Sequence, residues 1–234
     1  MEGFPDRLAR VREMLSLAAE SAGRPVSDIS IIGVTKTRSL QEILVAASIG
    51  GLTLFGENRI QEALPKISSW PEDLPVEWHL IGHLQKNKAR KALLNFTMIQ
   101  SLDSIELADI LERISLEIGR QGVPVLLEVN TSGESSKYGV KPEDASYIAS
   151  YICENCRNLS LQGLMTVGPL TEDEKQIRSA FGLLRGLLVS IGKDLNKTLP
   201  VLSMGMSYDF HWAVEEGSTM VRIGSALFGT REYN

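Results

Sequence analysis

The sequence has no excess of positive charge, no long hydrophobic run and very little cysteine. Its 24 Lys and Arg residues face 29 Asp and Glu residues, and the net charge of −5 argues against bulk binding of nucleic acid or anionic membranes. No apolar run approaches the roughly 20 residues that a membrane-spanning helix needs. The N-terminal segment MEGFPDRLARVREML lacks the apolar core of a secretory signal. We therefore expect a cytoplasmic protein.

The scarce cysteines and histidines do not form a recognisable metal site. Cys153 and Cys156 are spaced as CxxC, but the sequence offers no convincing second pair of ligands for a structural zinc ion. A thioredoxin-like pair would begin a helix after a strand, whereas this pair ends a helical pattern. His79 and His83 lie across a strand end, where side chains alternate, so we expect a packed His79 and a loop His83. The sequence predicts reduced, structural cysteines and no metal.

What the chain does contain is a regular alternation of strand-like and helix-like segments. The first strand-like run, Ile29 to Val34, is apolar and rich in β-branched residues, as in a strand buried on both faces. Seven further strand-like segments follow, each separated from the next by an amphipathic helical pattern. One of these helices starts near Arg59 and either breaks at Pro65 or continues one turn beyond it. Alternation of this kind indicates parallel strands joined by crossovers.

Eight such units predict an α/β protein with a single (β/α)₈ TIM barrel. We expect one domain over residues 1–234, with an extra N-terminal helix from about Asp6 to Ala22. A doubly wound open sheet is the alternative. Such a sheet usually has a glycine-rich turn after its first strand, whereas this chain has Thr-Lys-Thr-Arg there.

In a TIM barrel the functional residues stand at the carboxyl ends of the strands. Here the first strand ends at Lys36 and the eighth at Arg222, with small polar residues at several of the others. The set lacks the paired carboxylates of a glycosidase and the nucleophile elbow of a serine hydrolase. Desolvation at a strand end favours the neutral amine of a lysine, which can attack a carbonyl carbon. The alternative is that Lys36 simply extends into water.

The last two strands finish in Ser-Met-Gly-Met-Ser and Arg-Ile-Gly-Ser. Small residues let backbone N–H groups approach an anion, and the loops after these strands are the usual phosphate site of a barrel. The alternative is that Gly205 and Gly224 only turn the chain. A strand-end lysine opposite a phosphate site suits a phosphorylated aldehyde, and pyridoxal 5′-phosphate meets that description.

Several motifs occur in order along the whole chain. They are VTKTR around Lys36, FGEN at 55–58, WHLIGHLQKNK at 78–88, GESSKYGV at 133–140, GLMTVGP at 163–169, LSMGMSYDF at 202–210 and VRIGSALFG at 221–229. Together they resemble the pyridoxal phosphate homeostasis protein family. The resemblance implies a fold-type III pyridoxal phosphate protein, similar to the N-terminal domain of alanine racemase, with the cofactor as an internal aldimine on Lys36.

The resemblance also implies which residues bind the cofactor. Arg222 would face the pyridine nitrogen, Asn58 and Met165 would line the ring, and Ser207 with the Met206 backbone would help to hold the phosphate. The full implied set is Lys36, Asn58, Met165, Ser203, Met206, Ser207, Arg222, Gly224 and Ser225.

A permanently cationic Arg222 at the pyridine nitrogen disfavours protonation of the ring and so weakens it as an electron sink. Racemisation further needs an acid or base on the second face of the substrate, which racemases take from a second domain and a partner subunit. Because this chain ends at Asn234, just after the eighth unit, we expect no such domain. The sequence therefore predicts a monomer that holds and buffers the cofactor without efficient catalysis, with apo-enzymes as recipients. The alternative is an amino-acid racemase or lyase that uses Lys36. Both hypotheses require the cofactor, so a protein without cofactor that acted as an aldolase would contradict both.

Lys137 stands in the loop after the fifth strand, at the same mouth of the barrel as Lys36. It is either a solvated loop lysine or a second amine that accepts the aldehyde during loading or transfer.

Overall fold

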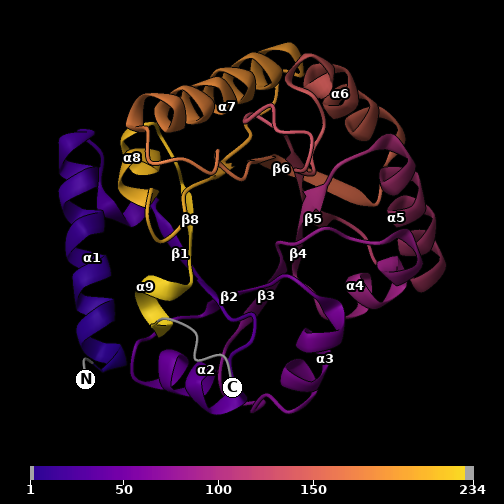
Figure 1. The fold of residues 1–234 in the computed structure, drawn as a ribbon. Helices are drawn as coiled ribbons and strands as arrows, with labels where there is room; N and C mark the ends of the chain where they lie inside the picture. Colours follow the sequence, from indigo (N-terminus) through magenta and orange to yellow (C-terminus); the bar gives the residue numbers. More distant parts are fainter. Residues whose placement is uncertain (1–2, 230–234) are drawn as a thin grey trace.

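The computed structural model describes residues 3–229, which contain a closed barrel of eight parallel strands ringed by helices (Figure 1). Each strand pairs with the next along the chain, and β8 closes the barrel against β1 with Arg222 opposite Ile32. The predicted TIM barrel is therefore confirmed. The strands are β1 (Ser30–Val34), β2 (Leu54–Glu57), β3 (Glu77–Leu80), β4 (Met98–Leu102), β5 (Val123–Glu128), β6 (Leu159–Met165), β7 (Val201–Ser203) and β8 (Met220–Ile223).

The helices lie outside the barrel and follow the strands in turn (Figure 1). Short 3₁₀ turns at Val26–Asp28, Lys86–Lys88 and Pro142–Asp144 precede β1, α4 and α6. The helix that contains Pro65 continues to Ser68, so the second of the two predicted alternatives is right. The α-helices are α1 (Phe4–Ser21), α2 (Leu40–Ser48), α3 (Ile60–Ser68), α4 (Ala89–Asn95), α5 (Ile105–Ile118), α6 (Ala145–Asn155), α7 (Glu174–Asp194), α8 (Phe210–Glu215) and α9 (Ser225–Phe228).

The apolar core lies between the strands and the surrounding helices. Strand residues such as Phe55, Leu80 and Val125 are fully buried, as the unbroken apolar composition of the strands predicts. The short α9 is not among the helices predicted from the sequence. It packs on α1, where the rings of Phe4 and Phe228 lie 5.7 Å apart.

A chain of hydrogen-bonded polar side chains crosses the barrel interior. The Ser203 hydroxyl on β7 donates to Gln100 Oε1 on β4 at 2.7 Å, and Gln100 Nε2 lies 2.9 Å from His79 Nδ1 on β3. Strands β4 and β7 are not neighbours, so the bond between Ser203 and Gln100 crosses the barrel. Burial lowers the pKa of His79, although Glu77 opposes this, and a neutral imidazole suits that interior. His79 is therefore packed, as predicted.

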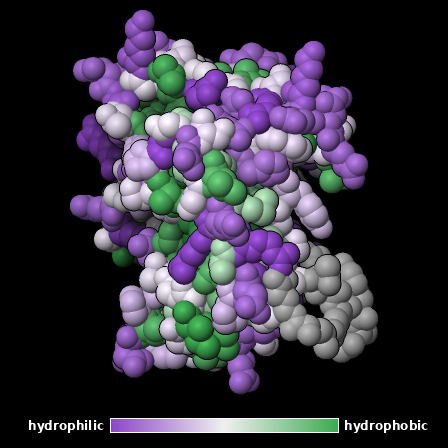
Figure 2. All heavy atoms as spheres, turned by 90° about the vertical axis from the view of Figure 1, so that its left-hand side faces the viewer, coloured by the Kyte–Doolittle hydropathy of each residue, from purple (hydrophilic) through white to green (hydrophobic). Residues whose placement is uncertain are grey.

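The N-terminal helix α1 covers the barrel where its first and last units meet (Figure 1). Arginine side chains fasten it, with Arg7 Nε donating to Leu227 O at 2.7 Å and an Arg12 Nη2 group donating to Gly50 O at 2.7 Å. Figure 2 looks onto this side of the molecule, where hydrophobic residues are interspersed among hydrophilic ones. Between residues 3 and 229 no helix combines the length and the hydropathy that crossing a bilayer requires.

Candidate functional site at the carboxyl ends of the strands

Lys36 lies two residues beyond β1, on a segment that is fastened to its neighbours on both sides. Next to it, the Thr35 hydroxyl donates to Glu57 Oε1 at the end of β2 at 2.6 Å. Lys66 Nζ lies 2.6 Å from the same carboxylate oxygen and donates to Thr35 O at 2.7 Å, so this buried carboxylate is paired. The backbone that carries Lys36 is therefore held against β2.

The turn after Lys36 is constrained as well. Thr37 has a φ of 64°, a left-handed conformation that is costly for a β-branched residue and persists only where its surroundings impose it. Arg38 Nη2 donates to Gly229 O at 2.5 Å, which ties the turn to the end of α9. Ser39 then caps α2, as its place in the sequence predicts. Together these contacts hold the backbone on both sides of Lys36.

Arg222 on β8 is buried within the barrel and has fixed partners. Its Nη1 group donates to the Ser203 hydroxyl at 2.8 Å and its Nη2 group to Thr166 O at 2.6 Å. Burial lowers the pKa of Arg222 to about 10, while Glu128 and Asp209 oppose the shift. Arg222 is thus a cation at neutral pH. Ser203, one of the predicted cofactor-binding residues, uses its hydroxyl between Arg222 and Gln100 and so positions the guanidinium.

The loops after β7 and β8 meet around the Ser207 hydroxyl. Its oxygen accepts hydrogen bonds from the backbone N–H groups of Gly224 and Ala226, both at 3.2 Å, where α9 begins. The Met206 N–H donates to Asp209 Oδ1 at 2.5 Å. Gly205 has a φ of 93°, and a Cβ atom there would lie 2.6 Å from Ala213 Cβ, so this tight loop requires glycine. Small groups and backbone donors therefore gather where a phosphate site was predicted.

Two other predicted residues lie at neighbouring strand ends. Met165, the last residue of β6, is fully buried and stands opposite Ser203 in the strand register. Asn58 follows β2, and its buried Oδ1 atom has no hydrogen-bond partner in the structure. Gly82 packs against the Asn58 backbone so closely that a Cβ atom at Gly82 would lie 2.4 Å from Asn58 O. The close packing of Gly82, just after β3, thus fixes the position of the Asn58 backbone, while the Asn58 Oδ1 atom has no hydrogen-bond partner. Ser225, at the start of α9, is exposed.

Glu128 is a functional candidate that the sequence reasoning did not identify. It ends β5 and is buried, and its Oε2 atom has no hydrogen-bond partner. Burial, and after it the nearby charge of Asp103, raise the pKa of Glu128 to about 7 against the opposing effect of Arg222. An acidic residue at the end of an otherwise apolar strand is the sequence signal that could have identified Glu128. The same signal occurs at Glu57, at the end of β2.

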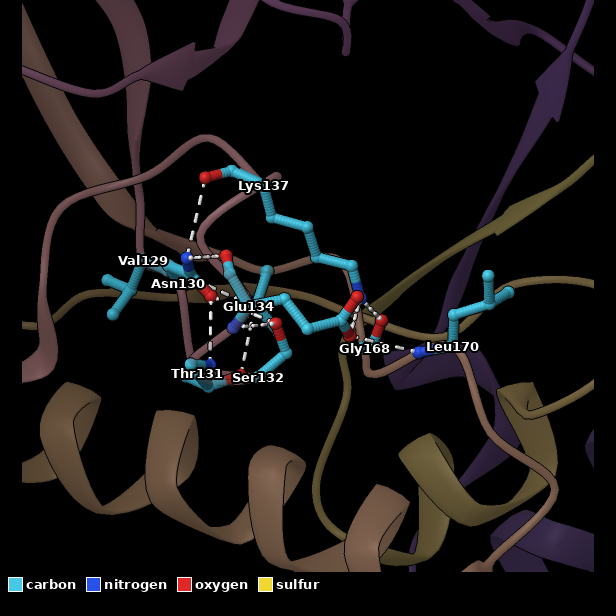
Figure 3. Close-up of polar contacts among 10 residues, drawn as sticks. Val129, Asn130, Thr131, Ser132, Glu134, Lys137, Gly168 and Leu170 are labelled. Carbon is cyan, nitrogen blue, oxygen red and sulfur yellow. Dashed lines mark hydrogen bonds and ion pairs between the residues drawn. The ribbon is translucent and has the colours of Figure 1, made fainter.

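Lys137 reaches from the loop after β5 to the loop after β6 (Figure 3). Its Nζ atom lies 2.8 Å from Glu134 Oε1 and donates to Gly168 O at 2.5 Å. The hydrogen bond from Lys137 is the main reason that the pKa of Glu134 lies below its usual range. With a side chain only 17% exposed, Lys137 is not the solvated loop lysine of the first alternative. Its role as a second amine stays a prediction.

Residues 7–232 match the model of the alanine racemase N-terminal domain family. A protein of Aquifex aeolicus named pyridoxal phosphate homeostasis protein is 41% identical to this chain, over 97% of the chain and 98% of the relative. A human protein of the same name is 39% identical, over 97% of the chain and 86% of the relative.

Solved structures show the same similarity. The structure of PipY from Synechococcus elongatus with pyridoxal phosphate bound is 33% identical, with a TM-score of 0.80 over 94% of this chain and 100% of that one. An alanine racemase of Clostridium difficile shares the fold, with a TM-score of 0.77 at 14% identity over 98% of this chain and 58% of that one.

Proposed function

This chain belongs to the family of pyridoxal phosphate homeostasis proteins, and from that membership we propose that it holds pyridoxal 5′-phosphate on Lys36. The cofactor, when bound, supplies an aldehyde carbon to which a primary amine attaches covalently. The observation that carries the proposal is the gathering, at one mouth of the barrel, of Lys36, the unpartnered Asn58 Oδ1 atom and the donors around Ser207.

The residues present fit such a group. Lys36 would supply the amine, and the constrained turn at Thr37 holds the backbone next to it. The N–H groups of Gly224 and Ala226 now donate to the Ser207 hydroxyl oxygen, and they and that hydroxyl would suit a phosphate, because backbone donors at a helix start favour an anion. Asn58 offers a polar atom with unused hydrogen-bonding capacity. The wider binding set, Met165, Ser203, Met206, Arg222, Gly224 and Ser225, belongs to the same proposal.

Binding without efficient catalysis follows from Arg222. Arg222 is held by Ser203 and Thr166. Next to the pyridine nitrogen of a bound cofactor, its positive charge would disfavour a proton on that nitrogen. The chain therefore stores and buffers the cofactor, and apo-enzymes that need it are the recipients. The alternative, a weak racemase or lyase, predicts exchange of the α-proton of an added amino acid in deuterated water at enzyme-like rates.

The same proposal includes the domain organisation, the oligomeric state and the cellular compartment of the chain. The chain acts as one domain and as a monomer, so sedimentation or light scattering should give a particle of about 25.7 kDa. It works in the cytoplasm, and the unpaired cysteines Cys153 and Cys156 support a reducing compartment. If Lys137 takes part in transfer, it must first leave Glu134.

Borohydride reduction tests the central step. Purified wild-type protein should be yellow, and reduction should fix the cofactor on the peptide that contains Lys36. Lys36→Ala and Lys36→Arg should each lose the reducible chromophore, while a control substitution of the exposed Lys141 should keep it. Stoichiometric, reducible cofactor in both Lys36 variants would refute the proposal.

A further inference from the structure

The hydrogen-bonded chain inside the barrel ends on Arg222. The Arg222 Nη1 group donates to the Ser203 hydroxyl at 2.8 Å. That hydroxyl donates to Gln100 Oε1 at 2.7 Å, and Gln100 Nε2 lies 2.9 Å from His79 Nδ1. The four side chains come from β8, β7, β4 and β3, and each is at most 4% exposed. Water therefore does not replace a lost partner in this chain.

Arg222 sets the direction of these hydrogen bonds. A guanidinium group only donates, so the Ser203 oxygen accepts from it and the Ser203 hydroxyl hydrogen is left for Gln100 Oε1. The Gln100 amide nitrogen also only donates, so His79 Nδ1 must accept from it. The ring proton of a neutral His79 is then on Nε2, which lies 3.7 Å from Glu77 Oε2 at the start of β3.

The imidazole thereby fixes the orientation of the Gln100 amide. Rotating that amide by 180° would place Oε1 against His79 Nδ1, so that two acceptors would face each other. The same rotation would turn Nε2 toward Ser203, and the Ser203 hydroxyl hydrogen would lose the acceptor that it now has. Mismatched polar groups are costly in a buried site, so a His79 that accepts at Nδ1 locks the amide.

The two acceptors of Arg222 differ in how firmly they are held. Its Nη2 group donates to Thr166 O at 2.6 Å, and this carbonyl belongs to the backbone directly after β6. The acceptor of Nη1 is the Ser203 hydroxyl, which can rotate about its side-chain bonds. Ser203 therefore depends on Gln100, and through it on His79, to keep its oxygen turned toward the guanidinium.

We propose that His79 and Gln100 are positioning residues for Arg222, which hold its guanidinium in the orientation that the contact with the ring nitrogen of the cofactor requires. The inference rests on the proposed function, because that function places Arg222 at this nitrogen. His79 and Gln100 act on the cofactor only through Ser203 and Arg222. A loosened guanidinium would place less positive charge at the ring nitrogen and make its protonation easier.

Matched substitutions separate this role from simple packing. Asn at position 79 can place an acceptor oxygen near the location of Nδ1, whereas Leu has nearly the shape of Asn and no acceptor. His79→Asn should therefore rescue what His79→Leu loses. Gln100→Met removes both polar groups of the amide at similar side-chain length. Ser115→Ala is the control, since Ser115 is a fully buried residue on α5 and lies outside this chain of hydrogen bonds.

NMR of the full chain observes the guanidinium directly, with and without added pyridoxal 5′-phosphate. In wild-type protein the Nη1 and Nη2 signals of Arg222, assigned with Arg222→Lys, should be separate because rotation of the group is restricted. They should stay separate in His79→Asn and Ser115→Ala and should merge in His79→Leu and Gln100→Met. Merged signals in wild-type protein, or separate signals in either folded His79→Leu or Gln100→Met, would overturn the inference whether or not the cofactor binds.

The effect on the cofactor is measured with pyridoxal 5′-phosphate that carries ¹⁵N in its ring. The pH at which the ring nitrogen takes up a proton should rise by about one unit, a tenfold change, in His79→Leu and Gln100→Met. It should stay at the wild-type value in His79→Asn and Ser115→Ala. Glu128 and Asp209, whose charges act on the guanidinium, are unchanged in every variant.

The two possible failures are distinguishable. An unaltered protonation midpoint in His79→Leu and Gln100→Met would refute the positioning role of these residues. A wild-type chain that leaves pyridoxal 5′-phosphate free in solution would instead refute the proposed function, and the Arg222 signals would still decide whether His79 and Gln100 hold the guanidinium.

Discussion

Glu128 shows how much a single buried carboxyl group can influence this barrel. It sits at the end of β5 with one oxygen unpartnered, beside Asp103 and within the field of Arg222. With a folded-state pKa of about 7, above the roughly 4.3 of an unfolded chain, the folded protein binds a proton that the unfolded chain releases. The stability that Glu128 contributes is therefore fully present below about pH 4 and is lost as the pH rises to 7.

Substitution of Glu128 by Gln should remove this dependence. Relative to the variant, wild-type protein should lose about 3 kcal/mol of unfolding free energy between pH 4 and pH 8, because 2 to 3 pKa units separate the two states. Urea unfolding at pH 4, 5, 6, 7 and 8 measures the difference. The exposed Glu143→Gln should run parallel to wild type. If the unfolding free energy of Glu128→Gln also ran parallel to that of wild type across this pH range, the predicted raised pKa of Glu128 would be refuted.

Among the elements, α2 matters because it follows directly on the turn that carries Lys36. Ser39 accepts a hydrogen bond from the Glu42 N–H, and the Glu42 carboxylate accepts one from the Ser39 N–H at 2.8 Å. Burial alone would raise the pKa of Glu42, but hydrogen bonds from Ser39 and the nearby Arg38 bring it below its usual range. This reciprocal cap defines where the Lys36 turn stops and the helix begins.

Replacing Ser39 with Ala should cost about 1 kcal/mol of unfolding free energy, since the N–H groups of the first turn of α2 lose their acceptor. The loosened turn should also weaken cofactor binding at Lys36. Ser48→Ala, at the other end of α2, removes only a bond to the Leu44 carbonyl and should change stability less. Chemical denaturation with a cofactor titration tests both. Equal effects of the two substitutions would mean that the cap does not support the site.

At the scale of the whole molecule, α1 determines how well the barrel is closed. It lies against α8 and α9, elements more than 180 residues away in the sequence, and its residues Leu8, Val11 and Leu15 are buried. Since β8 carries Arg222 and α9 supplies donors for the proposed phosphate site, α1 also supports the proposed cofactor site from outside the barrel. Its opposite face is open to solvent (Figure 2).

Two leucines on this one helix provide a matched pair. Leu8 is 3% exposed and Leu17 is 60% exposed. Leu8→Ala should lower the unfolding free energy by about 2–5 kcal/mol through lost burial and the cavity left behind, whereas Leu17→Ala should change it by no more than about 0.5 kcal/mol. Thermal and urea unfolding measure both. A small effect of Leu8→Ala would show that α1 packs only loosely on the barrel.

Much of the architecture was predictable from local pattern. The apolar, β-branched composition of strands such as β1 reports burial on both faces, and eight repeats of strand and helix leave a closed barrel as the natural arrangement. Capping by Ser39 and the glycine requirement near Gly205 are local too. The motifs around Lys36 and Arg222 identified the family for the same reason, since each is a short run of adjacent residues.

What the sequence by itself determined was thus the eight strands, the order of the elements and the strand ends that carry Lys36, Asn58 and Arg222, but not the short helix α9. Only the tertiary structure decided which side chains meet. Gln100 reaches Ser203 across the barrel, Asp103 orients His83, and Glu128 is buried in the field of Arg222. These pairs are 20 to 103 residues apart in the sequence, and no local pattern encodes them. Closure of the barrel brings distant strand ends together, and the burial that follows changes the charges that the side chains carry.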